Sequence, residues 1–474
     1  MDRLAFADIQ GIIVRGYKEL RFARFVLLDA PDDAVPAARA WLAALPVTSA
    51  STRSMETAVQ VAFTWPGLLR LSARELDQRL FAPEFFEGMS SDAHRSRALG
   101  DVGEHGPDTW AWGGTGDRVH ALVLLYATTR EGLDALDRRT FEGCPCRARR
   151  LETRTLSDDE RARKYWFREH FGFRDGVAQP RLALHASTPA DMRHGVAKDA
   201  GEGAAVRAGE FLFGYANEYE KEPDGAGPDE LAKHGSFLVF RQLEQNVCGF
   251  WKYARDRARA LDMSPILLAA KMVGRWPNGA PLVRAPDGET AGLEQFDAFG
   301  YAETDALGHA CPLGSHVRRS NPRDALFDDA GESVKVVNKH RLIRRGRPYG
   351  EPIATPLDPS AFLQRFEEIA AADAEKRGLH FLCFNANIRR QFEFVQQTWI
   401  NNPKFAHQYD GPDPIVAQQV RVPGGACEPS GPEFELPGSP ARRRVSSLET
   451  FVRMRGGAYF FMPGLAAYKW ILGG

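Results

Sequence analysis

Three segments of the chain place titratable side chains among glycines, prolines and aromatic residues. The first reads Phe171-Gly172-Phe173-Arg174-Asp175-Gly176-Val177-Ala178-Gln179-Pro180. An Asp-Gly pair is most often a simple turn, but this aspartate lies between an aromatic stretch and an apolar stretch that ends in proline. A carboxylate on such a turn can take a proton from a ligand and return it, so Asp175 is a candidate acid–base group.

The second segment contains an isolated histidine beside two arginines. It reads Cys311-Pro312-Leu313-Gly314-Ser315-His316-Val317-Arg318-Arg319-Ser320-Asn321-Pro322-Arg323-Asp324. A lone histidine is more often structural than a ligand, and His309 with Cys311 would give only an irregular zinc site. A single imidazole with positive charge a few residues away fits haem instead, because the iron takes a ring nitrogen and arginines pair with the propionates. His316 is therefore a candidate haem ligand.

The third segment is basic and leads into a Pro-Tyr-Gly turn. It reads Lys339-His340-Arg341-Leu342-Ile343-Arg344-Arg345-Gly346-Arg347-Pro348-Tyr349-Gly350. Its simplest interpretation is a basic edge strand. If residues 341–345 are extended, alternation puts Arg341 and Arg345 on one face and Arg344 on the other, so only one of these faces can line a pocket. The spacing does not decide which.

Aromatic residues at Phe381, Phe384 and Tyr459-Phe460-Phe461 are core residues by default, and they also suit the lining of a haem pocket. The sequence contains no phosphate loop or nucleophile elbow, and no carboxylate pair at a useful spacing. Gly113-Gly114-Thr115-Gly116 does not open a helix after a strand, so it is a weak indication of a nucleotide site.

The composition is that of an ordinary globular protein. Of 474 residues, 43% are hydrophobic and 26% are charged, and the length favours two or three domains. The 61 Lys and Arg residues offset 62 Asp and Glu residues, and the net charge of -1 gives no reason to expect nucleic acid. The short basic runs are expected on solvated faces; they are Arg318-Arg319, Arg344-Arg345 and Arg442-Arg443-Arg444.

Cysteine usage and the chain ends favour a cytoplasmic protein. Six cysteines in a chain of this length do not form a disulfide framework, and Cys144-Pro145-Cys146 has no second pair at zinc-finger spacing. This pattern indicates a reducing compartment. The N-terminus lacks a signal-peptide pattern, and the longest apolar segments, such as residues 121–126, are of strand length rather than membrane-spanning length. We therefore expect no membrane partner.

A short apolar strand-like run followed at once by a helix-like stretch recurs four times. The strand-like runs are rich in Val, Leu and Phe, and the stretches after them space apolar residues at three and four. The units are residues 22–28 with 34–45, 121–128 with 130–138, 236–241 with 242–261, and 379–384 with 388–399.

A polar Gly/Ala-rich stretch at residues 186–209, followed by an acidic loop at 218–229, separates the second unit from the third. Two units in each half predict an α+β fold of tandem ferredoxin-like domains, each an antiparallel sheet packed with helices. We place an N-terminal domain with the Asp175 motif at residues 1–205 and a C-terminal domain at 206–474. Residues 420–444 predict an extended surface loop, and the apolar C-terminus predicts a tail docked on the core.

Together these segments resemble the dye-decolorizing (DyP-type) peroxidases over nearly the whole chain. Five motifs occur in the family's order, although one alone would be weak evidence. They are Asp8-Ile9-Gln10-Gly11, Gly172-Phe173-Arg174-Asp175-Gly176, the His-x-Arg-Arg-x-Asn-Pro-Arg segment from His316, the Arg-Arg-Gly-x-Pro-Tyr-Gly segment from Arg344, and Gly457-Ala458-Tyr459-Phe460-Phe461-Met462-Pro463-Gly464.

The resemblance implies a haem b enzyme in which the C-terminal domain holds most of the cofactor. It makes His316 the axial ligand of the iron, Asp175 the distal acid–base group, and Arg344 the cation that stabilises the charge of the peroxide. Peroxide cleavage needs a base that moves a proton between the two oxygens and positive charge beside the breaking bond, so these roles suit the two side chains. Because a carboxylate is a weaker base than histidine, we expect an acidic optimum.

The resemblance also implies the residues that surround the haem. Arg323 would pair with a propionate, and Leu379 and Phe381 would shield the distal face. Glu393 is a candidate to orient His316. The full set expected to contact the cofactor besides His316 is Arg323, Arg344, Leu379, Phe381, Val177 and Gln179.

The expected partners are hydrogen peroxide and organic reductants. Small phenols could enter a haem-access channel, whereas bulky dyes would need a surface Trp or Tyr to relay electrons, and 9 Trp and 11 Tyr give too many candidates to choose from. Three alternatives stay open: a protein that releases iron or porphyrin from haem, a haem-storage or cargo protein, and a binding module without haem. The chain ends at Gly474, soon after the Tyr-Phe-Phe motif, which disfavours packaging. The oligomeric state, a homo-oligomer included, is not decided by the sequence.

Overall fold

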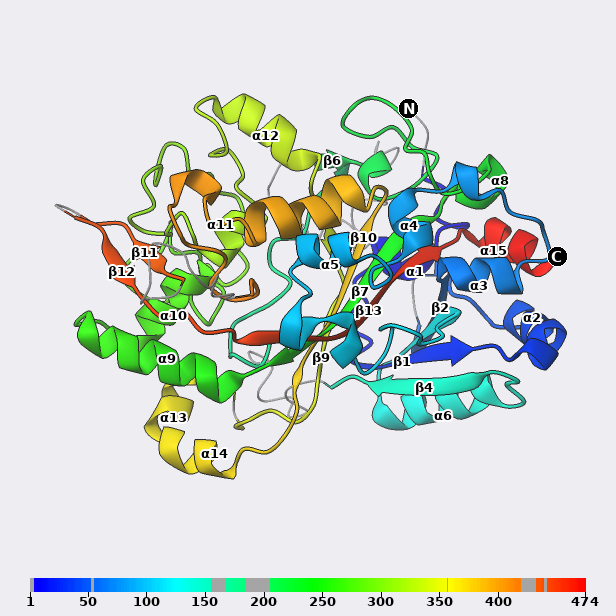
Figure 1. Cartoon of the computed structure of the whole chain (residues 1–474), viewed down its shortest axis with the longest axis horizontal. Helices are drawn as coiled ribbons and strands as arrows, with labels where there is room; N and C mark the ends of the chain where they lie inside the picture. The colour runs from blue at the N-terminus through cyan, green and yellow to red at the C-terminus, as the bar shows by residue number, and fades with distance from the viewer. Residues whose placement is uncertain are drawn as a thin grey trace.

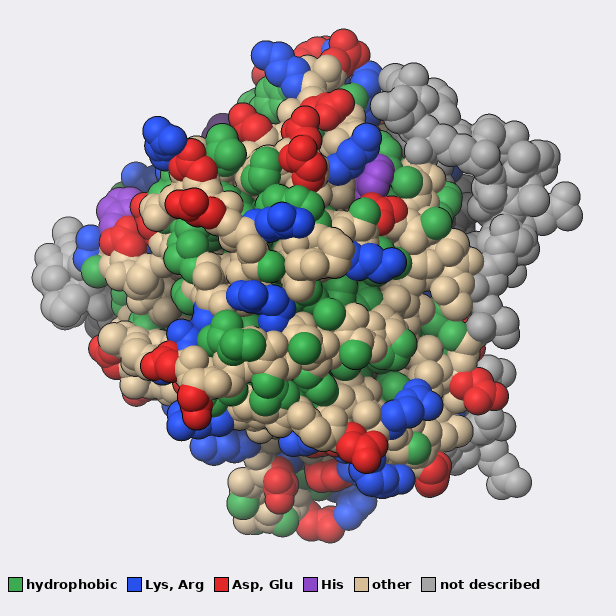
Figure 2. Space-filling model, turned by 90° about the vertical axis from the view of Figure 1, so that its right-hand side faces the viewer, with side chains coloured by type: hydrophobic (Ala, Val, Ile, Leu, Met, Phe, Trp, Pro, Cys, Tyr) green, Lys and Arg blue, Asp and Glu red, His purple; other side chains and the backbone are tan. Residues whose placement is uncertain are grey.

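The computed structural model describes residues 4–52, 55–154, 168–183, 205–355, 357–418, 432–438 and 441–474. Across these residues, no helix has the length and apolar character needed to cross a membrane. On the face that Figure 2 shows, Lys and Arg side chains are interspersed with Asp and Glu side chains. This mixture agrees with the near-neutral net charge.

One large sheet of nine strands runs through the molecule and joins its two halves (Figure 1). The strand order is β4-β1-β3-β2-β13-β7-β10-β8, and β9 also pairs with β10. All of these pairs are antiparallel. The strands are β1 (Phe22–Asp29), β2 (Thr57–Phe63), β3 (Ala121–Ala127), β4 (Arg147–Glu152), β7 (Ser236–Gln245), β8 (Ile343–Arg344), β9 (Arg347–Tyr349), β10 (Gly378–Asn385) and β13 (Val452–Met462).

Each half repeats the strand order of a ferredoxin-like fold. Counted along the chain, β1 to β4 are arranged 4-1-3-2, and β7, β8 with β9, β10 and β13 are arranged in the same way. The halves meet where β2 pairs with β13. The predicted α+β fold with two ferredoxin-like units is therefore confirmed. The boundary at residue 205 stays a prediction, because residues 184–204 lie outside the described parts of the chain.

Helices and short strands complete the fold. The helices are α1 (Gly11–Val14), α2 (Val35–Ala43), α3 (Trp65–Leu71), α4 (Pro83–Glu87), α5 (Ala93–Leu99), α6 (Arg130–Phe141), α8 (Asp229–Ala232), α9 (Val247–Ala260), α10 (Pro265–Val273), α11 (His316–Ser320), α12 (Ala330–Asn338), α13 (Pro359–Gln364), α14 (Phe366–Ala372), α15 (Leu465–Leu472) and the π-helical pair η7 (Arg389–Glu393) and η8 (Val395–Ile400). The other strands are β5 (Arg181–Ala183), β6 (Ala205–Arg207), β11 (Phe434–Leu436) and β12 (Arg443–Val445).

Apolar cores cover both faces of the sheet. All seven residues of β3 are buried, as expected for a strand with a core on each side. Val123 and Leu125 pack into the core that includes α2, α3, α6 and α15, whereas Leu122 and Leu124 pack against the N-terminal segment around Ile12. The face of the sheet that carries Val123 and Leu125 continues into the C-terminal half. There it carries the polar residues that form the site.

The structure corrects two of the predicted helices. The third begins at Val247 rather than at residue 242, because β7 continues to Gln245 and Asn246 then caps the helix by accepting the N–H of Gly249. The fourth is helical as predicted but is wound as a π-helix, a rare form that is frequent at functional sites.

The C-terminus packs on the core, as predicted, but it does so as the central strand β13 followed by α15 rather than as a tail. β13 lies between β2 and β7, with an irregularity between Met454 and Gly456. A Cβ atom at Gly456 would lie 2.4 Å from the indole nitrogen of Trp112, so this glycine permits a close approach rather than marking a loop. The surface loop predicted for residues 420–444 is also wrong in its described part, where β11 and β12 pair.

Candidate active site

A cavity of about 280 Å³ lies over the face of β7, β10 and β13. Its floor consists of alternate residues of these strands, among them Arg241, Leu243, Leu379, Phe381 and Met454. Cross-strand pairing aligns them, since Phe381 lies opposite Arg241, and Leu243 lies opposite both Leu379 and Met454. The other walls include His316 of α11 and the residues of the π-helical pair at Phe392, Val395, Gln396 and Ile400.

His316 is the first residue of α11, and one of its ring nitrogens is already engaged. Its Nδ1 donates a hydrogen bond to Asp413 Oδ2 at 2.9 Å. Asp413 is fully buried, and its Oδ1 accepts the N–H groups of Ile415 and Val416 at 2.9 Å. Burial would raise the pKa of Asp413, but the charge and hydrogen bond of His316 outweigh it, and the pKa is lowered. Nε2 is therefore the nitrogen left to ligate a metal.

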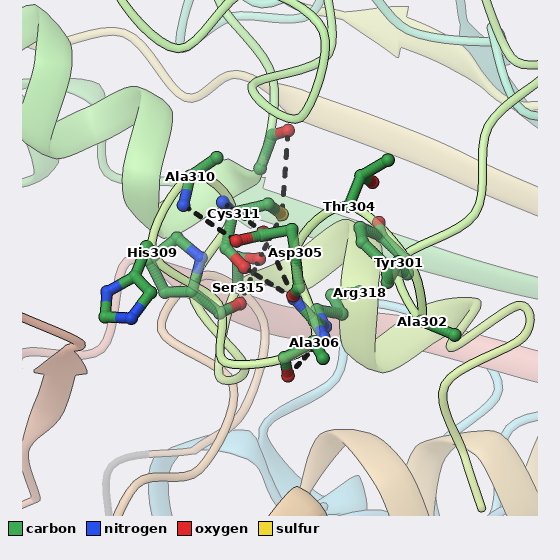
Figure 3. Close-up of polar contacts among 12 residues, drawn as sticks. Tyr301, Ala302, Thr304, Asp305, Ala306, His309, Ala310, Cys311, Ser315 and Arg318 are labelled. Carbon is green, nitrogen blue, oxygen red and sulfur yellow. Dashed lines mark hydrogen bonds and ion pairs between the residues drawn. The ribbon is translucent and has the colours of Figure 1, made fainter. Parts of the chain in front are cut away.

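A buried polar cluster fixes the loop that leads into α11. Asp305 accepts the N–H of Ala310 at 2.9 Å and that of Cys311 at 2.8 Å, and Figure 3 shows how these residues lie. Arg318, two residues after His316, donates to the backbone oxygens of Asp305 and Cys311 at 2.9 Å. The guanidinium of Arg318 also lies 4.3 Å from the centre of the Tyr301 ring. These bonds hold both ends of the turn before His316.

Arg319 ties α11 to the segment that leads to Asp413. Its guanidinium donates to the carbonyl oxygens of Trp399 at 2.7 Å and Asn402 at 2.9 Å, and also to that of Gly411. Arg318 and Arg319 are 3% and 0% exposed, so the prediction that this basic run lies on a solvated face is wrong. The two arginines satisfy buried carbonyl groups instead.

Asp175 and Arg344, from opposite halves of the chain, meet at the same cavity. Arg344 donates to Asp175 Oδ1 at 3.1 Å, and the same oxygen accepts the N–H of Gly176 at 2.6 Å. Both side chains are about one-third exposed, at 33% for Arg344 and 34% for Asp175. Gly172 and Gly176 have φ of +94° and +75°, so glycine permits the turn that presents the carboxylate.

Gln179 positions Arg344 and does not line the cavity. Its amide nitrogen donates to the carbonyl oxygen of Arg344 at 3.1 Å, and its amide oxygen accepts the N–H of Arg344 at 3.0 Å. Val177, Leu379 and Phe381 do line the cavity, and their contact with a haem stays a prediction. Gln179 therefore joins the turn of Asp175 to β8 through two hydrogen bonds from its side chain to the backbone of Arg344.

No family model matches the chain, but its curated relatives and solved structures agree with one another. A dye-decolorizing peroxidase of Mycetinis scorodonius is 30% identical, with 99% of this chain and 88% of the relative covered. A multifunctional dye peroxidase of Amycolatopsis is 35% identical over 63% of this chain and 60% of the relative. Among solved structures, the DyP-type peroxidase of Auricularia auricula-judae has a TM-score of 0.76 and 26% identity, and covers 100% of each chain.

The chain belongs to the dye-decolorizing peroxidase family. It is therefore an oxidoreductase that acts on peroxide, and haem is the cofactor of its family. A second solved relative, the DyP-type peroxidase of Anabaena, has a TM-score of 0.76 and 26% identity over 98% of this chain and 94% of its own.

Several arginines line this cavity, and they differ in how far protein partners engage them. Arg323 lines the cavity, but its guanidinium donates to the carbonyl oxygens of Asp297 at 2.8 Å and Phe299 at 3.0 Å and also pairs with the Asp297 carboxylate. Arg275 pairs with the same carboxylate at 2.8 Å. The guanidinium of Arg341 has no hydrogen-bond or ion-pair partner among the described residues. Burial, followed by the charge of Arg323, lowers the pKa of Arg341 to about 10.

Two expectations about the orientation of arginines and of Glu393 are wrong. Arg341 and Arg344 both line the cavity, whereas Arg345 donates to the carbonyl oxygen of Ile12 on the far side of the sheet. The alternation failed because β8 is only two residues long. Glu393 accepts hydrogen bonds from Arg95 at 2.8 Å and Tyr459 at 2.9 Å, and the partner of His316 is Asp413 instead.

Further titratable groups line the cavity and were not found from the sequence. Glu169 accepts the N–H groups of Phe171 and Phe173 at 2.9 Å, and burial raises its pKa to about 7. Asp101, which follows α5, forms an ion pair with Arg241 of β7. Only Asp413 had a local signal that could have been used, because it lies in Gly411-Pro412-Asp413-Pro414, between two prolines.

Proposed function

We propose that the protein is a haem b peroxidase that reduces hydrogen peroxide and oxidises organic donors such as phenols and dyes. The observation that carries this proposal is the Asp175–Arg344 pair, which opens on the same cavity as His316. A carboxylate for proton transfer and a fixed guanidinium for charge stabilisation are what peroxide cleavage requires of a protein.

The residues present fit a haem. His316 would hold the iron through Nε2, with Asp413 keeping its ring in the tautomer that leaves this nitrogen unprotonated. Arg341, with Arg323 beside it, would bind the propionates, and Leu379 and Phe381 would provide an apolar surface. When bound, the iron supplies the redox chemistry that the protein side chains lack.

Asp175 performs the proton transfer in this proposal. Its Oδ1 is occupied by Arg344 and Gly176, so Oδ2 is the oxygen left to take a proton from one peroxide oxygen and return it to the other. Arg344 stabilises the negative charge that develops on the departing oxygen. Gln179 holds the backbone of Arg344 in place while this happens.

The decisive experiment compares Asp175→Asn and His316→Ala with the parent protein. We expect His316→Ala to lose the haem absorption band, whereas Asp175→Asn keeps it and reacts with hydrogen peroxide about 100- to 10,000-fold more slowly in stopped flow. Glu169→Gln is a matched control, since it neutralises a neighbouring carboxyl without touching Arg344. Guaiacol turnover measured alongside reports on the organic donor.

Two outcomes would contradict the proposal. If Asp175→Asn reacts as fast as the parent, Arg344 or water carries the proton step. If the parent binds haem but loses it on turnover and releases iron or porphyrin, the protein handles haem rather than using it. The acidic optimum, the cytoplasmic location and the lack of nucleic-acid and membrane partners stay predictions from the sequence, and a pH–rate profile tests the first.

A further inference from the structure

A second carboxylate–guanidinium pair lines the same cavity on the other side of β10. Asp101 and Arg241 are 2% and 6% exposed, and Arg241 donates to Asp101 Oδ1. Arg241 lies on β7, opposite Phe381 of β10. Arg344 lies on β8, the other neighbour of β10, opposite Cys383. The two pairs therefore flank one strand, and Asp101–Arg241 is separate from the pair assigned to peroxide.

This second pair has an unused donor and an unused acceptor. Arg241 NH1 and Asp101 Oδ2 are buried and have no hydrogen-bond partner among the described residues. A buried polar atom without a partner is costly, so such atoms are normally satisfied by something that binds. Because the pair has no net charge, it favours a neutral ligand over an anion.

The surroundings of the pair are mainly apolar and aromatic, and they include His105, whose pKa burial lowers to about 4. Leu99 and Met454 line the cavity beside it, and the guanidinium of Arg241 lies 5.7 Å from the centre of the Phe392 ring. A ligand that suits this place has one hydroxyl group, which both donates and accepts, on a flat apolar body. A small monocyclic phenol has these properties.

We propose that Asp101 and Arg241 bind the hydroxyl group of a small neutral phenol that serves as reductant. This inference rests on the proposed function, because it identifies the class of electron donor. The phenol O–H donates to Asp101 Oδ2, and Arg241 NH1 donates to the phenol oxygen. Two phenols reduce one hydrogen peroxide to two waters. Each phenol gives one electron to the peroxide-oxidised enzyme, and its O–H bond breaks to leave a phenoxyl radical. The proton passes through Asp101 and ends in one of the two waters.

The ionisation of Asp101 is compatible with this role. Burial raises its pKa to about 6, against the opposing effect of Arg241. Above that pH, where the binding test is made, the group is a carboxylate, which accepts the phenol hydrogen bond, and it is a stronger base than an exposed aspartate. At the acidic optimum expected for the reaction with peroxide, protonation of Asp101 should weaken phenol binding. Sulfonated dyes do not fit, because their anionic group would be desolvated beside Asp101.

The test uses the holoenzyme and the double variant Asp101→Leu/Arg241→Met. Both charges are removed together, so neither is left buried without its partner. Binding of 4-fluorophenol, followed by 19F NMR without peroxide, should weaken about 30-fold, the effect of losing two hydrogen bonds. The KM for guaiacol should rise by a similar factor, whereas kcat/KM for a sulfonated anthraquinone dye and the rate of reaction with peroxide should stay within about twofold of the parent.

Two controls separate binding from structure. Fluorobenzene has the ring without the hydroxyl group, so its affinity should not depend on the pair. Glu210→Leu/Arg390→Met removes another ion pair, whose carboxylate is fully buried and which does not line the cavity, and it should leave 4-fluorophenol affinity unchanged.

The outcomes distinguish this inference from the proposed function. Unchanged 4-fluorophenol affinity and guaiacol KM in the double variant would overturn the inference, as would an equal loss of phenol, dye and peroxide reactivity. If the parent lacks peroxidase activity but binds 4-fluorophenol through this pair, the proposed function fails while the binding site stands.

Discussion

Replacing Asp413 by asparagine should weaken haem binding by changing the proton on His316. The contacts of the Asp413 side chain include a hydrogen bond from His316 and two from the backbone at Ile415 and Val416. An asparagine has only one oxygen. If that oxygen keeps both backbone N–H groups, its NH₂ group faces His316 Nδ1 and donates to it. The ring proton must then move to Nε2, the nitrogen that would hold the iron.

The magnitude follows from the alternatives open to the variant. If the amide of the asparagine were flipped, its oxygen would face His316 and two backbone N–H groups of a fully buried site would be unsatisfied, which costs about 1–3 kcal/mol for each. The arrangement in which the oxygen keeps the backbone N–H groups is therefore favoured. To bind iron through Nε2, the ring of His316 must move its proton back to Nδ1. The hydrogen bond from the new NH₂ group is then lost, and the Nδ1–H and NH₂ donors face each other. That costs about 1.4–2.8 kcal/mol, a 10- to 100-fold loss of haem affinity, in the usual range for such partners of a metal-bound histidine.

The assay is haem transfer from Asp413→Asn to an excess of apomyoglobin, followed by the change in the haem absorption band. We expect haem to leave the variant about 10- to 100-fold faster than the parent. Asp305→Asn is the matched control: its carboxylate is also buried and accepts two backbone N–H groups near α11, but it does not bond to His316. Equal haem loss from the two variants would refute the tautomer argument and indicate general loosening.

Three further predictions concern residues around the site and the core. Burial lowers the pKa of His380 from 6.5 to about 3. The free energy of unfolding should therefore fall by up to about 5 kcal/mol as the pH falls from 6.5 to 3. In His380→Phe, the urea denaturation midpoint should depend less on pH over this range. Gln179→Leu removes two hydrogen bonds to the backbone of Arg344 and should slow the stopped-flow reaction with peroxide about tenfold without changing haem content. Arg341→Met removes a cation that has no partner among the described residues, and it should speed haem transfer about tenfold; an unchanged rate would exclude Arg341 as a propionate partner.

Strands with continuous apolar runs could be predicted from the sequence, and strands whose polar residues have tertiary partners could not. β1, β3, β7 and β10 were predicted because both of their faces are apolar over most of their length. β2 contains Gln60, which is buried because it accepts the N–H of Ile12 in α1. β4 is basic and lies at the sheet edge, where its arginines reach solvent and acidic partners.

The site residues were predicted where their chemistry was local. Asp175, His316 and Arg344 each lie in a short motif, and the structure brings all three to one cavity. The partner of His316 is 97 residues away, and its only local signal is its position between two prolines. Arg241 lies in an apolar strand, so its pairing with Asp101 becomes recognisable only when the fold is known.

The sheet register is set by the face of the sheet that takes no part in the site. Leu382 and Phe384 of β10 are fully buried on the far face, against Leu238 and Phe240 of β7. A slip of one residue would expose this apolar set and turn every cavity side chain of β10 away from the cavity. The far core therefore fixes Phe381 opposite Arg241 and Cys383 opposite Arg344. Because the far core specifies the register, the cavity face can carry charged pairs, which alone would specify the register poorly.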